Sequence, residues 1–377
     1  MSGCKEREAY LFLSLLQART GASLVPRLGE GRVRDVLEKP AAQVSGEMNL
    51  TAKSAGTLAE LREIFDGRAL LERLGQKGVR AVTLADEDYP ARLVAAPDPP
   101  PALFVRGRLT SDVLVALVGS RKATPAGMEM AHELGRRLAE RGACVVSGLA
   151  LGVDAAAHEG AVAAGGETVG VLGCGIDVVY PRANEDLFRR VREQGALVSE
   201  YCLGEAPLAW RFPARNRIIA GLSDAVVVVE APEKSGALIT ARHALDAGRD
   251  VWAVPGPPGM AGCRGSNRLL ADGAGVIWDV PEFLEAVTGW TGEKVTAVSA
   301  PGRSEPREPA LPEPPIGLPE AETGVLRGVD FRSVGADVVA RRTGVEMKVV
   351  LSALAMLELK GYVARDAAGN YARRAVS

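Results

Sequence analysis

Residues 114–118 constrain the fold of this chain more than any other stretch, because their sequence LVALV contains five consecutive apolar residues. A run without polar alternation is typical of a strand that helices cover on both faces, as in a parallel sheet. Thr124 is well placed to cap the helix that follows, and Pro125 suits the first position of that helix. The sequence therefore predicts a strand–turn–helix unit of an α/β protein.

Further apolar runs occur along the chain, and stretches with helical spacing separate them. Two such runs, at 79–84 and 103–105, precede the strand at 114–118. Others follow it at 144–146, 168–172, 197–200, 225–229, 251–254 and 275–277. This alternation of strand and helix is typical of a sheet with parallel strands and helices on both faces. We therefore predict an extended Rossmann-like α/β domain over residues 79–290.

Three other regions flank this domain. Residues 1–78 are predicted to form a small helical domain, in which the turn Leu28-Gly29-Glu30-Gly31 either contacts DNA phosphate, as in a helix-hairpin-helix, or joins packed helices. The acidic Glu30 favours packing. Seven prolines between Pro301 and Pro319 predict a linker over residues 291–318. Three helices and a hairpin predict a winged-helix domain over residues 319–377.

Charge and cysteine content limit the class of protein. The chain has 45 basic and 47 acidic residues, which argues against a polycation that coats nucleic acid but allows a local basic patch. Its five cysteines are scattered without a C-x-x-C motif, which predicts a reduced, cytoplasmic protein. No apolar run approaches the roughly 20 residues that cross a bilayer, so we expect no membrane partner.

Three turns rich in glycine and serine are predicted at the carboxyl edge of the sheet. They are Gly119-Ser120-Arg121, Ser147-Gly148 and Lys234-Ser235-Gly236. Free N–H groups at a helix N-terminus, together with the positive end of the helix dipole, bind anions such as phosphate. The guanidinium of Arg121 adds a fork that pairs well with phosphate. This edge of the sheet is therefore a predicted phosphate site.

The densest cationic stretch is residues 210–217, with the sequence WRFPARNR. Its candidate contact residues are Arg211, Phe212, Arg215, Asn216 and Arg217. Guanidinium groups contact phosphates and aromatic faces stack on bases, so the stretch fits a surface for single-stranded nucleic acid. The alternative is a helix start whose aromatic side chains fill the core, and the residues alone favour neither interpretation.

Two groups of residues invite a catalytic interpretation. Asp154 and His158 stand one helical turn apart, and form either an acid–base or metal half-site or, as we favour, a structural pair beside the phosphate loop. Cys174 is either a nucleophile or, as we favour, a small residue in a tight turn. The sequence has no dinucleotide or P-loop motif and no acidic cluster. We therefore expect no catalytic residue, no metal and no cofactor.

Six segments taken together resemble the DNA processing protein A family, also called DprA or Smf. They are GSR, SGLALGVDAAAH, VLGCGIDVVYP, FPARNRIIAGLSDAVVVVEA, SGALITARHALDAGRDVWAVPG and GSNRLLADGA, and the similarity spans residues 80–285. The resemblance implies an extended Rossmann domain that binds single-stranded DNA without catalysis. It also implies a homodimer that loads RecA onto incoming strands during natural transformation.

The resemblance also implies roles for particular residues. Arg121 and residues 211–217 would line the DNA pocket, with Phe212 against a base. The pocket would be shaped by Gly119, Ser120, Ser147, Gly148, Ser235 and Gly236. The C-terminal winged helix would correspond to a domain found in many members of the family.

Two other functions compete with this one. A Rossmann-type nucleotide-processing hydrolase, such as a phosphoribohydrolase, would use the same phosphate-binding edge with the aspartate–histidine pair, although no motif marks its general acid. A regulator of duplex DNA would use the winged helix. Its presumed recognition helix is poorly suited to groove reading, because acidic residues accompany its basic ones (Lys348, Lys360, Glu346 and Glu358).

Overall fold

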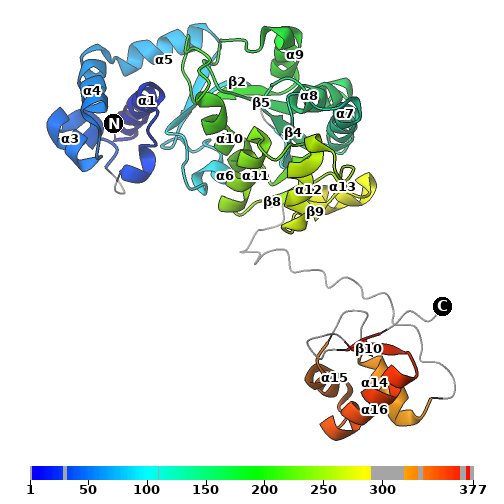
Figure 1. Cartoon of the computed structure of the whole chain (residues 1–377). Coiled ribbons are helices and arrows are strands. Elements are labelled where there is room, and N and C mark those ends of the chain that lie inside the picture. The colour runs from blue at the N-terminus through cyan, green and yellow to red at the C-terminus, as the bar shows by residue number, and fades with distance from the viewer. Residues whose placement is uncertain are drawn as a thin grey trace. The chain divides into compact units, whose positions relative to one another are not determined.

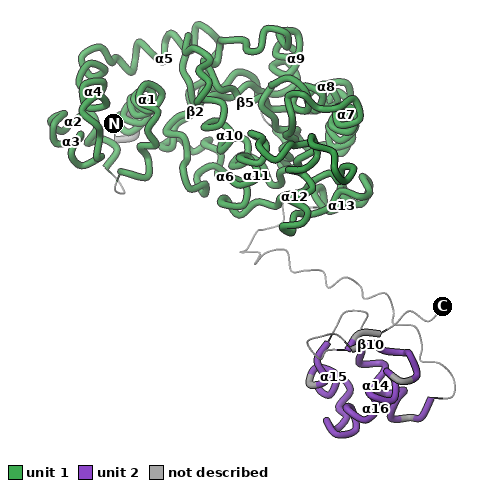
Figure 2. Tube along the Cα trace, in the orientation of Figure 1, with its two compact units in different colours: residues 1–293 green, residues 294–377 purple. Residues whose placement is uncertain are grey.

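The computed structural model describes residues 2–28, 32–108, 110–289, 318–329, 334–365 and 371–373. The chain divides into two compact units, residues 1–293 and residues 294–377, which Figure 2 colours separately. The helical N-terminal region and the sheet thus belong to one unit. The predicted tight turn at residues 29–31 and nearly all of the predicted linker lie outside the described residues.

The N-terminal region is helical, as predicted. It contains α1 (Ser2–Thr20), η1 (Val25–Arg27), α2 (Asp35–Glu38), α3 (Ala41–Glu47), α4 (Ala52–Ile64) and α5 (Gly67–Gln76). Phe12 and Leu16 of α1 are buried against Leu58 and Leu61 of α4 in a core of their own. Leu11, on another side of α1, belongs to a cluster that includes residues of the sheet. Helix α1 therefore contributes to both cores, which explains why the two regions form one compact unit.

One large sheet organises the rest of this unit. Its strands are β1 (Arg80–Thr83), β2 (Ala102–Gly107), β3 (Leu114–Val118), β4 (Cys144–Ser147), β5 (Thr168–Leu172), β6 (Ala196–Ser199), β7 (Ala225–Val228), β8 (Asp250–Ala253) and β9 (Gly275–Val276). They lie in the order β1-β2-β6-β5-β4-β3-β7-β8-β9. The strands from β6 to β9 are parallel, whereas β1 and β2 extend the sheet in antiparallel pairing. The predicted extended Rossmann-like sheet is thus confirmed.

The order of the strands creates one switch point. The chain runs outward from β3 through β4, β5 and β6, and then returns to place β7 on the other side of β3. Connections on the two sides of this point leave the sheet toward opposite faces, so a crevice opens at the carboxyl ends of β3 and β7. This is where ligands bind in open parallel sheets.

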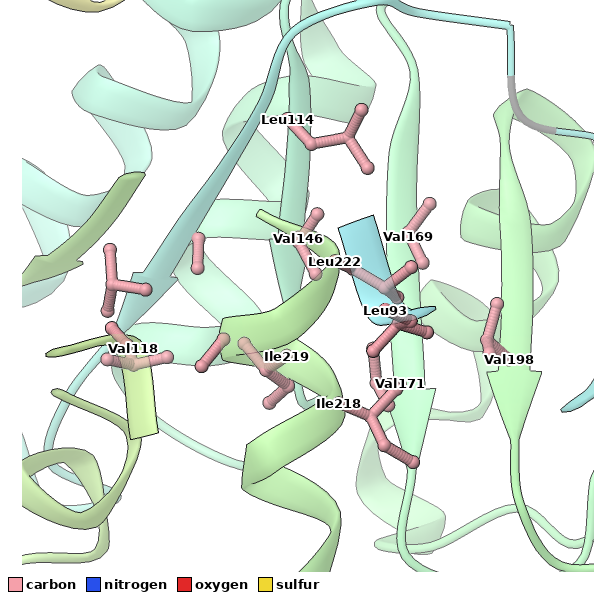
Figure 3. Packing of buried hydrophobic residues seen from close by; sticks show 14 of the residues in the cluster. Leu93, Leu114, Val118, Val146, Val169, Val171, Val198, Ile218, Ile219 and Leu222 are labelled. Carbon is pink, nitrogen blue, oxygen red and sulfur yellow. The ribbon is translucent and has the colours of Figure 1, made fainter. Parts of the chain in front are cut away.

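Helices cover both faces of the sheet (Figure 1). They are α6 (Ala91–Val94), α7 (Pro125–Glu140), α8 (Val153–Ala163), α9 (Glu185–Gln194), α10 (Arg211–Leu222), α11 (Gly236–Asp246), α12 (Arg264–Ala271) and α13 (Val280–Thr288), with short turns η2 (Arg182–Asn184) and η3 (Ala261–Cys263). Side chains of β3 alternate between two clusters: Ala116 packs with α10 and α11, and Leu117 packs with α7 and α8. The first of these clusters is drawn in Figure 3. Both faces of β3 are therefore buried, as its unbroken apolar sequence predicts.

Local signals in the sequence set the ends of two helices beside the switch point. Thr124 caps α7, where its Oγ1 accepts a hydrogen bond from the N–H of Gly127 at 3.1 Å, and Pro125 follows it at the first position. Ser235 caps α11 by accepting from the N–H of Ala237 at 3.2 Å. The Thr124 cap was predicted and is confirmed, and the predicted Ser235-Gly236 turn does begin a helix, with Ser235 as its cap.

Helices α7 and α8 approach each other closely through glycine. A Cβ atom at Gly160 would lie 2.0 Å from the carbonyl oxygen of His132, and one at Gly135 would lie 2.2 Å from that of Ala157. Backbone is in direct contact with backbone at both places, so neither helix accommodates a side chain there without moving. This contact holds the two helices as one layer beneath the sheet.

The second unit is a winged helix. It contains α14 (Glu320–Arg327), α15 (Ala336–Thr343), α16 (Met347–Leu359) and the antiparallel strands β10 (Val363–Arg365) and β11 (Tyr371–Arg373). Leu326, Val339 and Leu354 are fully buried, one from each helix. Among the described residues, no helix combines the length and hydropathy that a bilayer span needs.

The glycine contact between α7 and α8 generates a stability prediction. Gly160→Ala should lower the free energy of unfolding by about 2 kcal/mol, because the added methyl group forces the helices apart. Gly56→Ala in α4 is the matched control, since nothing lies within 4 Å of its Cβ position. It should raise stability by about 0.5 kcal/mol. Urea unfolding followed by tryptophan fluorescence measures this, because all four tryptophans lie in residues 1–293. Equal stability of the two variants would contradict the described contact.

Candidate nucleic-acid interface

A cavity of about 480 Å³ lies at the switch point. Four segments form most of it: the turn after β3, the turn between β4 and α8 with the start of that helix, the first two turns of α10, and the start of α11. It is lined by Gly119, Ser120, Arg121, Lys122, Ala150, Asp154, Phe212, Pro213, Arg215, Asn216, Lys234, Ser235 and Gly236, among others. The sequence thus brings glycine turns, cations and an aromatic ring together at the predicted edge.

The turn after β3 is held in place by a residue beyond β7. The N–H of Ser120 donates to the carbonyl oxygen of Glu230 at 2.7 Å. The buried carboxylate of Glu230 accepts from the N–H of Thr124 at 3.1 Å and also from its hydroxyl group. Gly119 is required because a Cβ there would lie 2.5 Å from Val153 at the start of α8. These contacts fix Arg121 at the rim of the cavity.

The start of α11 forms the opposite wall. Ser235 caps the helix, and Asn216 of α10 donates from Nδ2 to the carbonyl oxygen of Gly236 at 3.1 Å. This bond links the two helices across the cavity. The positive end of the α11 dipole and the exposed Lys234 beside it favour an anion.

Arg215 forms the floor of the cavity. Its guanidinium is buried, donates to the carbonyl oxygen of Gly148 at 3.0 Å, and also donates to that of Val171. Burial lowers its pKa to about 10, so it remains charged at neutral pH, and the nearby carboxylate of Asp154 opposes that shift. Arg215 therefore adds a fixed positive charge that ties the ends of β4 and β5 to α10.

Phe212 lies between a cation and a second aromatic ring. The Cζ of Arg121 is 5.4 Å from the centroid of the Phe212 ring, and the Tyr180 ring centroid is 5.3 Å from it on a tilt of 35°. Gly173 permits this position, because a Cβ there would lie 2.8 Å from the Phe212 ring. The result is a partly exposed platform of guanidinium and aromatic faces, which is the kind of surface on which bases stack.

Nine of the thirteen predicted contact residues line this cavity. They are Gly119, Ser120, Arg121, Phe212, Arg215, Asn216, Lys234, Ser235 and Gly236. Ser147 and Gly148 lie just beneath it: the hydroxyl group of Ser147 is buried and donates to the carbonyl oxygen of Leu117 at 2.6 Å, and Arg215 covers Gly148. These two residues support the cavity and do not line it.

The other two predicted residues, Arg211 and Arg217, point away from the cavity. Arg211 is buried, donates to the carbonyl oxygen of Ala18 at 3.0 Å, and pairs with Glu205 at 2.7 Å. Arg217 pairs with Asp98 and Glu200. Arg217 is two positions from Arg215, and residues two positions apart in a helix do not share a face. Arg211 stands at the first position of α10, and its partners Ala18 and Glu205 hold its guanidinium outside the cavity. All three nitrogens of Arg217 donate hydrogen bonds within the protein, whereas the buried Nε of Arg211 has no hydrogen-bond partner among the described residues.

The structure separates Asp154 from His158, contrary to the predicted pair. The carboxylate of Asp154 accepts from the N–H groups of Gly148 at 3.1 Å and Ala150 at 3.4 Å. The Nδ1 of the buried His158 lies 2.6 Å from the hydroxyl oxygen of Thr168. Burial lowers the pKa of His158 to about 3, so the ring is neutral. Asp154 does brace the turn beside the cavity, but without the histidine.

The structure gives no support to the other chemical candidates. The Cys174 thiol is buried, and burial raises its pKa to about 11, so it is protonated at neutral pH. Among the described residues, no group of three histidine, cysteine or acidic side chains is arranged to hold a metal ion. In the winged helix, Lys360, the residue directly after α16, pairs with Glu322 at 2.7 Å.

Sequence reasoning missed two residues of the site, Lys122 and Tyr180. Lys122 lines the cavity next to Arg121, and its position directly after the predicted phosphate turn was an available signal. Tyr180 follows the glycine turn after β5 at the same sheet edge, which was the corresponding signal for it. Its ring is 43% exposed beside Phe212, so it enlarges the platform.

Comparison with known proteins agrees with this architecture. The family model described as DNA recombination-mediator protein A matches residues 80–288, and the model described as DprA winged helix domain matches residues 308–369. Protein Smf of Escherichia coli is 38% identical over 310 residues, which cover 80% of this chain and 79% of that protein.

Two solved structures are also similar. The X-ray structure of DNA processing protein A from Streptococcus pneumoniae has 33% identity and a TM-score of 0.63, and the match covers 75% of this chain and 98% of that one. A structure of DNA processing protein A from Helicobacter pylori, which addresses the single-stranded DNA binding mode of that protein, has 32% identity and a TM-score of 0.51. That match covers 56% of this chain and 96% of that one. Since a single family model spans more than half of its residues and its relatives match over most of their length, this chain belongs to the DNA recombination-mediator protein A family.

Proposed function

We propose that this protein binds single-stranded DNA in the cavity at the switch point and acts without catalysis. In this proposal it is a cytoplasmic homodimer that protects incoming DNA and loads RecA onto it during natural transformation. The observation that carries the binding step is the platform of Arg121, Phe212 and Tyr180 beside the start of α11. The aromatic face can stack on a base and the anion site at the same edge can bind a phosphate, so together they match a nucleotide.

Charge supports a sugar-phosphate ligand at this edge. Within the described part of the chain, no carboxylate lies within ion-pair distance of Arg121, Lys122 or Lys234. These three cations are exposed, so their charge is available to phosphates. The protein as a whole has a formal net charge of -2, so this is a local basic patch on a nearly neutral protein.

Family membership supports the rest of the proposal. The Helicobacter pylori relative is described as binding single-stranded DNA, and the matched region of this chain includes the whole cavity. RecA loading, the homodimer and a role in natural transformation are proposed from the family resemblance. A pull-down with RecA in the presence and absence of a single-stranded oligonucleotide tests the partner directly.

The alternative of a nucleotide hydrolase has weaker support. Asp154 is the acidic residue among those lining the cavity, and its carboxylate already accepts two backbone hydrogen bonds. His158 is buried and neutral, and the Cys174 thiol is protonated. A duplex-binding winged helix is also weakly supported, because exposed apolar residues such as Met347 and Leu351 occupy α16.

Replacement of Arg121 tests the binding site. Arg121→Ala should weaken binding to a single-stranded oligonucleotide by roughly tenfold, because it removes a charged contact to phosphate. The slope of log affinity against log salt concentration should fall by about 0.7, the value for one phosphate contact on a single strand. Fluorescence anisotropy over a salt series measures both quantities.

The matched control is Arg141→Ala. Arg141 is equally exposed, but it follows the end of α7, which leads to the opposite edge of the sheet. Its replacement should leave affinity and slope unchanged. Equal affinity of the wild type for duplex and single strands, or an unchanged slope in Arg121→Ala, would count against the proposed site.

Replacement of Asp154 separates binding from hydrolysis. Asp154→Asn keeps an acceptor oxygen for the turn and removes a negative charge from the cavity, so single-strand affinity should rise by a few fold. Neither protein should release a base from nucleoside monophosphates. Chromatography of the reaction products checks this, and base release by the wild type that is lost in Asp154→Asn would favour the hydrolase.

A further inference from the structure

Helix α10 has two sides that serve different neighbours. Phe212 and Asn216 line the DNA cavity, whereas Arg217 lines a separate hollow of about 220 Å³ between α10, the end of α1 and α11. Positions 215 and 217 point about 200° apart around a helix, so these two arginines face different surroundings. The second side of α10 is therefore joined to the N-terminal region.

Arg217 is held by two carboxylates. Its Nη1 and Nη2 donate to the two carboxylate oxygens of Glu200 at 2.8 and 2.7 Å, and its Nε donates to a carboxylate oxygen of Asp98 at 2.9 Å. The Arg217 side chain is 12% exposed and that of Glu200 is 6% exposed. A bidentate fork in such a buried setting fixes the direction of both groups.

The N-terminal helices hold the same two acidic residues. The Nε2 of Gln17 in α1 donates to Glu200 at 3.4 Å, and the hydroxyl group of Ser23 donates to Asp98 at 2.6 Å. The hydroxyl group of Ser14 donates to the Glu200 carbonyl oxygen at 3.3 Å. A continuous polar network therefore runs from α1 through these two acidic residues to Arg217.

Arg211, the other arginine that points away from the cavity, joins the start of α10 to the same N-terminal region. Arg211 donates to the carbonyl oxygen of Ala18 near the end of α1 and stacks over the Tyr201 ring, with its Cζ 4.4 Å from the centroid. The Trp210 ring packs on Gly21, where a Cβ would be 3.6 Å away. Trp210 and Arg211 directly precede Phe212 in the sequence. Their contacts therefore fix the position of Phe212 in the platform.

We propose that Arg217 is a positioning residue for the DNA cavity and that the N-terminal helices, acting through it, set the single-strand affinity. In this arrangement α1 contacts no DNA. It fixes the axial position and rotation of α10, and α10 presents Phe212 and Arg215 to the ligand. This inference rests on the proposed function, because it concerns the affinity of the same cavity.

The inference has a reciprocal consequence. If the N-terminal contacts stabilise the DNA-binding position of α10, bound DNA must stabilise those contacts by the same free energy. The backbone N–H of Leu24, which donates to Oε1 of Gln17 at 3.1 Å, lies in the segment that would report this. Amide hydrogen exchange of residues 17–24 should therefore slow when DNA binds at the distant cavity.

The test compares four variants of the full chain with the wild type on a thymidine oligonucleotide over a salt series. Arg217→Lys keeps the charge but cannot form the fork, and Gln17→Ala leaves both ion pairs in place in case the first variant is unstable. Each should weaken binding by roughly three- to tenfold, with the salt slope unchanged. Arg121→Ala is the reference variant, which shows how affinity and salt slope change when a phosphate contact is lost. Gln43→Ala is the matched control, because among the described residues the Gln43 side chain hydrogen-bonds to Glu47, within the same N-terminal region and away from the network.

Exchange of residues 17–24 is the second readout. The oligonucleotide should slow this exchange in the wild type and in Gln43→Ala, but not in Arg217→Lys. A general loss of stability would not produce this difference in the response to DNA. A fall in the slope of Arg217→Lys by about 0.7, as for Arg121→Ala, would overturn the inference, because Arg217 would then contact phosphate. Wild-type affinity in both Arg217→Lys and Gln17→Ala would overturn it as well. Failure of the wild type to bind would instead overturn the proposed function.

Discussion

Burial of both faces of a parallel sheet is the constraint on which this structure depends. Because helices cover β3 on each side, its polar chemistry is confined to the residues that follow it. The strand order then makes β3 and β7 the place where connections diverge, and the turns after both strands meet there. A nearly neutral protein thereby gathers exposed cations at one edge of its sheet.

Helix α10 links the two halves of the larger unit. Its apolar residues, among them Ile218 and Ile219, pack on the sheet (Figure 3), and its polar residues divide between the DNA cavity and the N-terminal network. The buried Arg215 joins it to the strand ends, and Arg217 joins it to acidic residues that α1 also contacts. Arg215 and Arg217 are held by different neighbours on different sides of the helix, so α10 has little freedom to rotate.

Much of the fold could be predicted because its signals are local. Thr124 and Ser235 are helix caps by residue type alone, and the apolar run of β3 predicts burial on both faces. The cavity residues after β3 and before α11 could be predicted for the same reason. The direction of Arg211 and Arg217 could not, because it depends on carboxylates and carbonyl groups far away in the sequence. The same limit explains why Asp154 and His158, one turn apart, have separate partners.

The position of Glu230 determines how a nucleotide would enter the cavity. The carboxylate of Glu230 accepts hydrogen bonds from the N–H and the hydroxyl group of Thr124, the residue that caps α7. A negative charge therefore already lies at the start of α7, and the start of α11 is left as the stronger site for an anion. With the aromatic platform on the other side, a nucleotide bound there would place its phosphate toward Ser235 and its base toward Phe212. The sugar-phosphate backbone of a bound strand would then follow the α11 side of the cavity, and its bases would follow the Phe212 side.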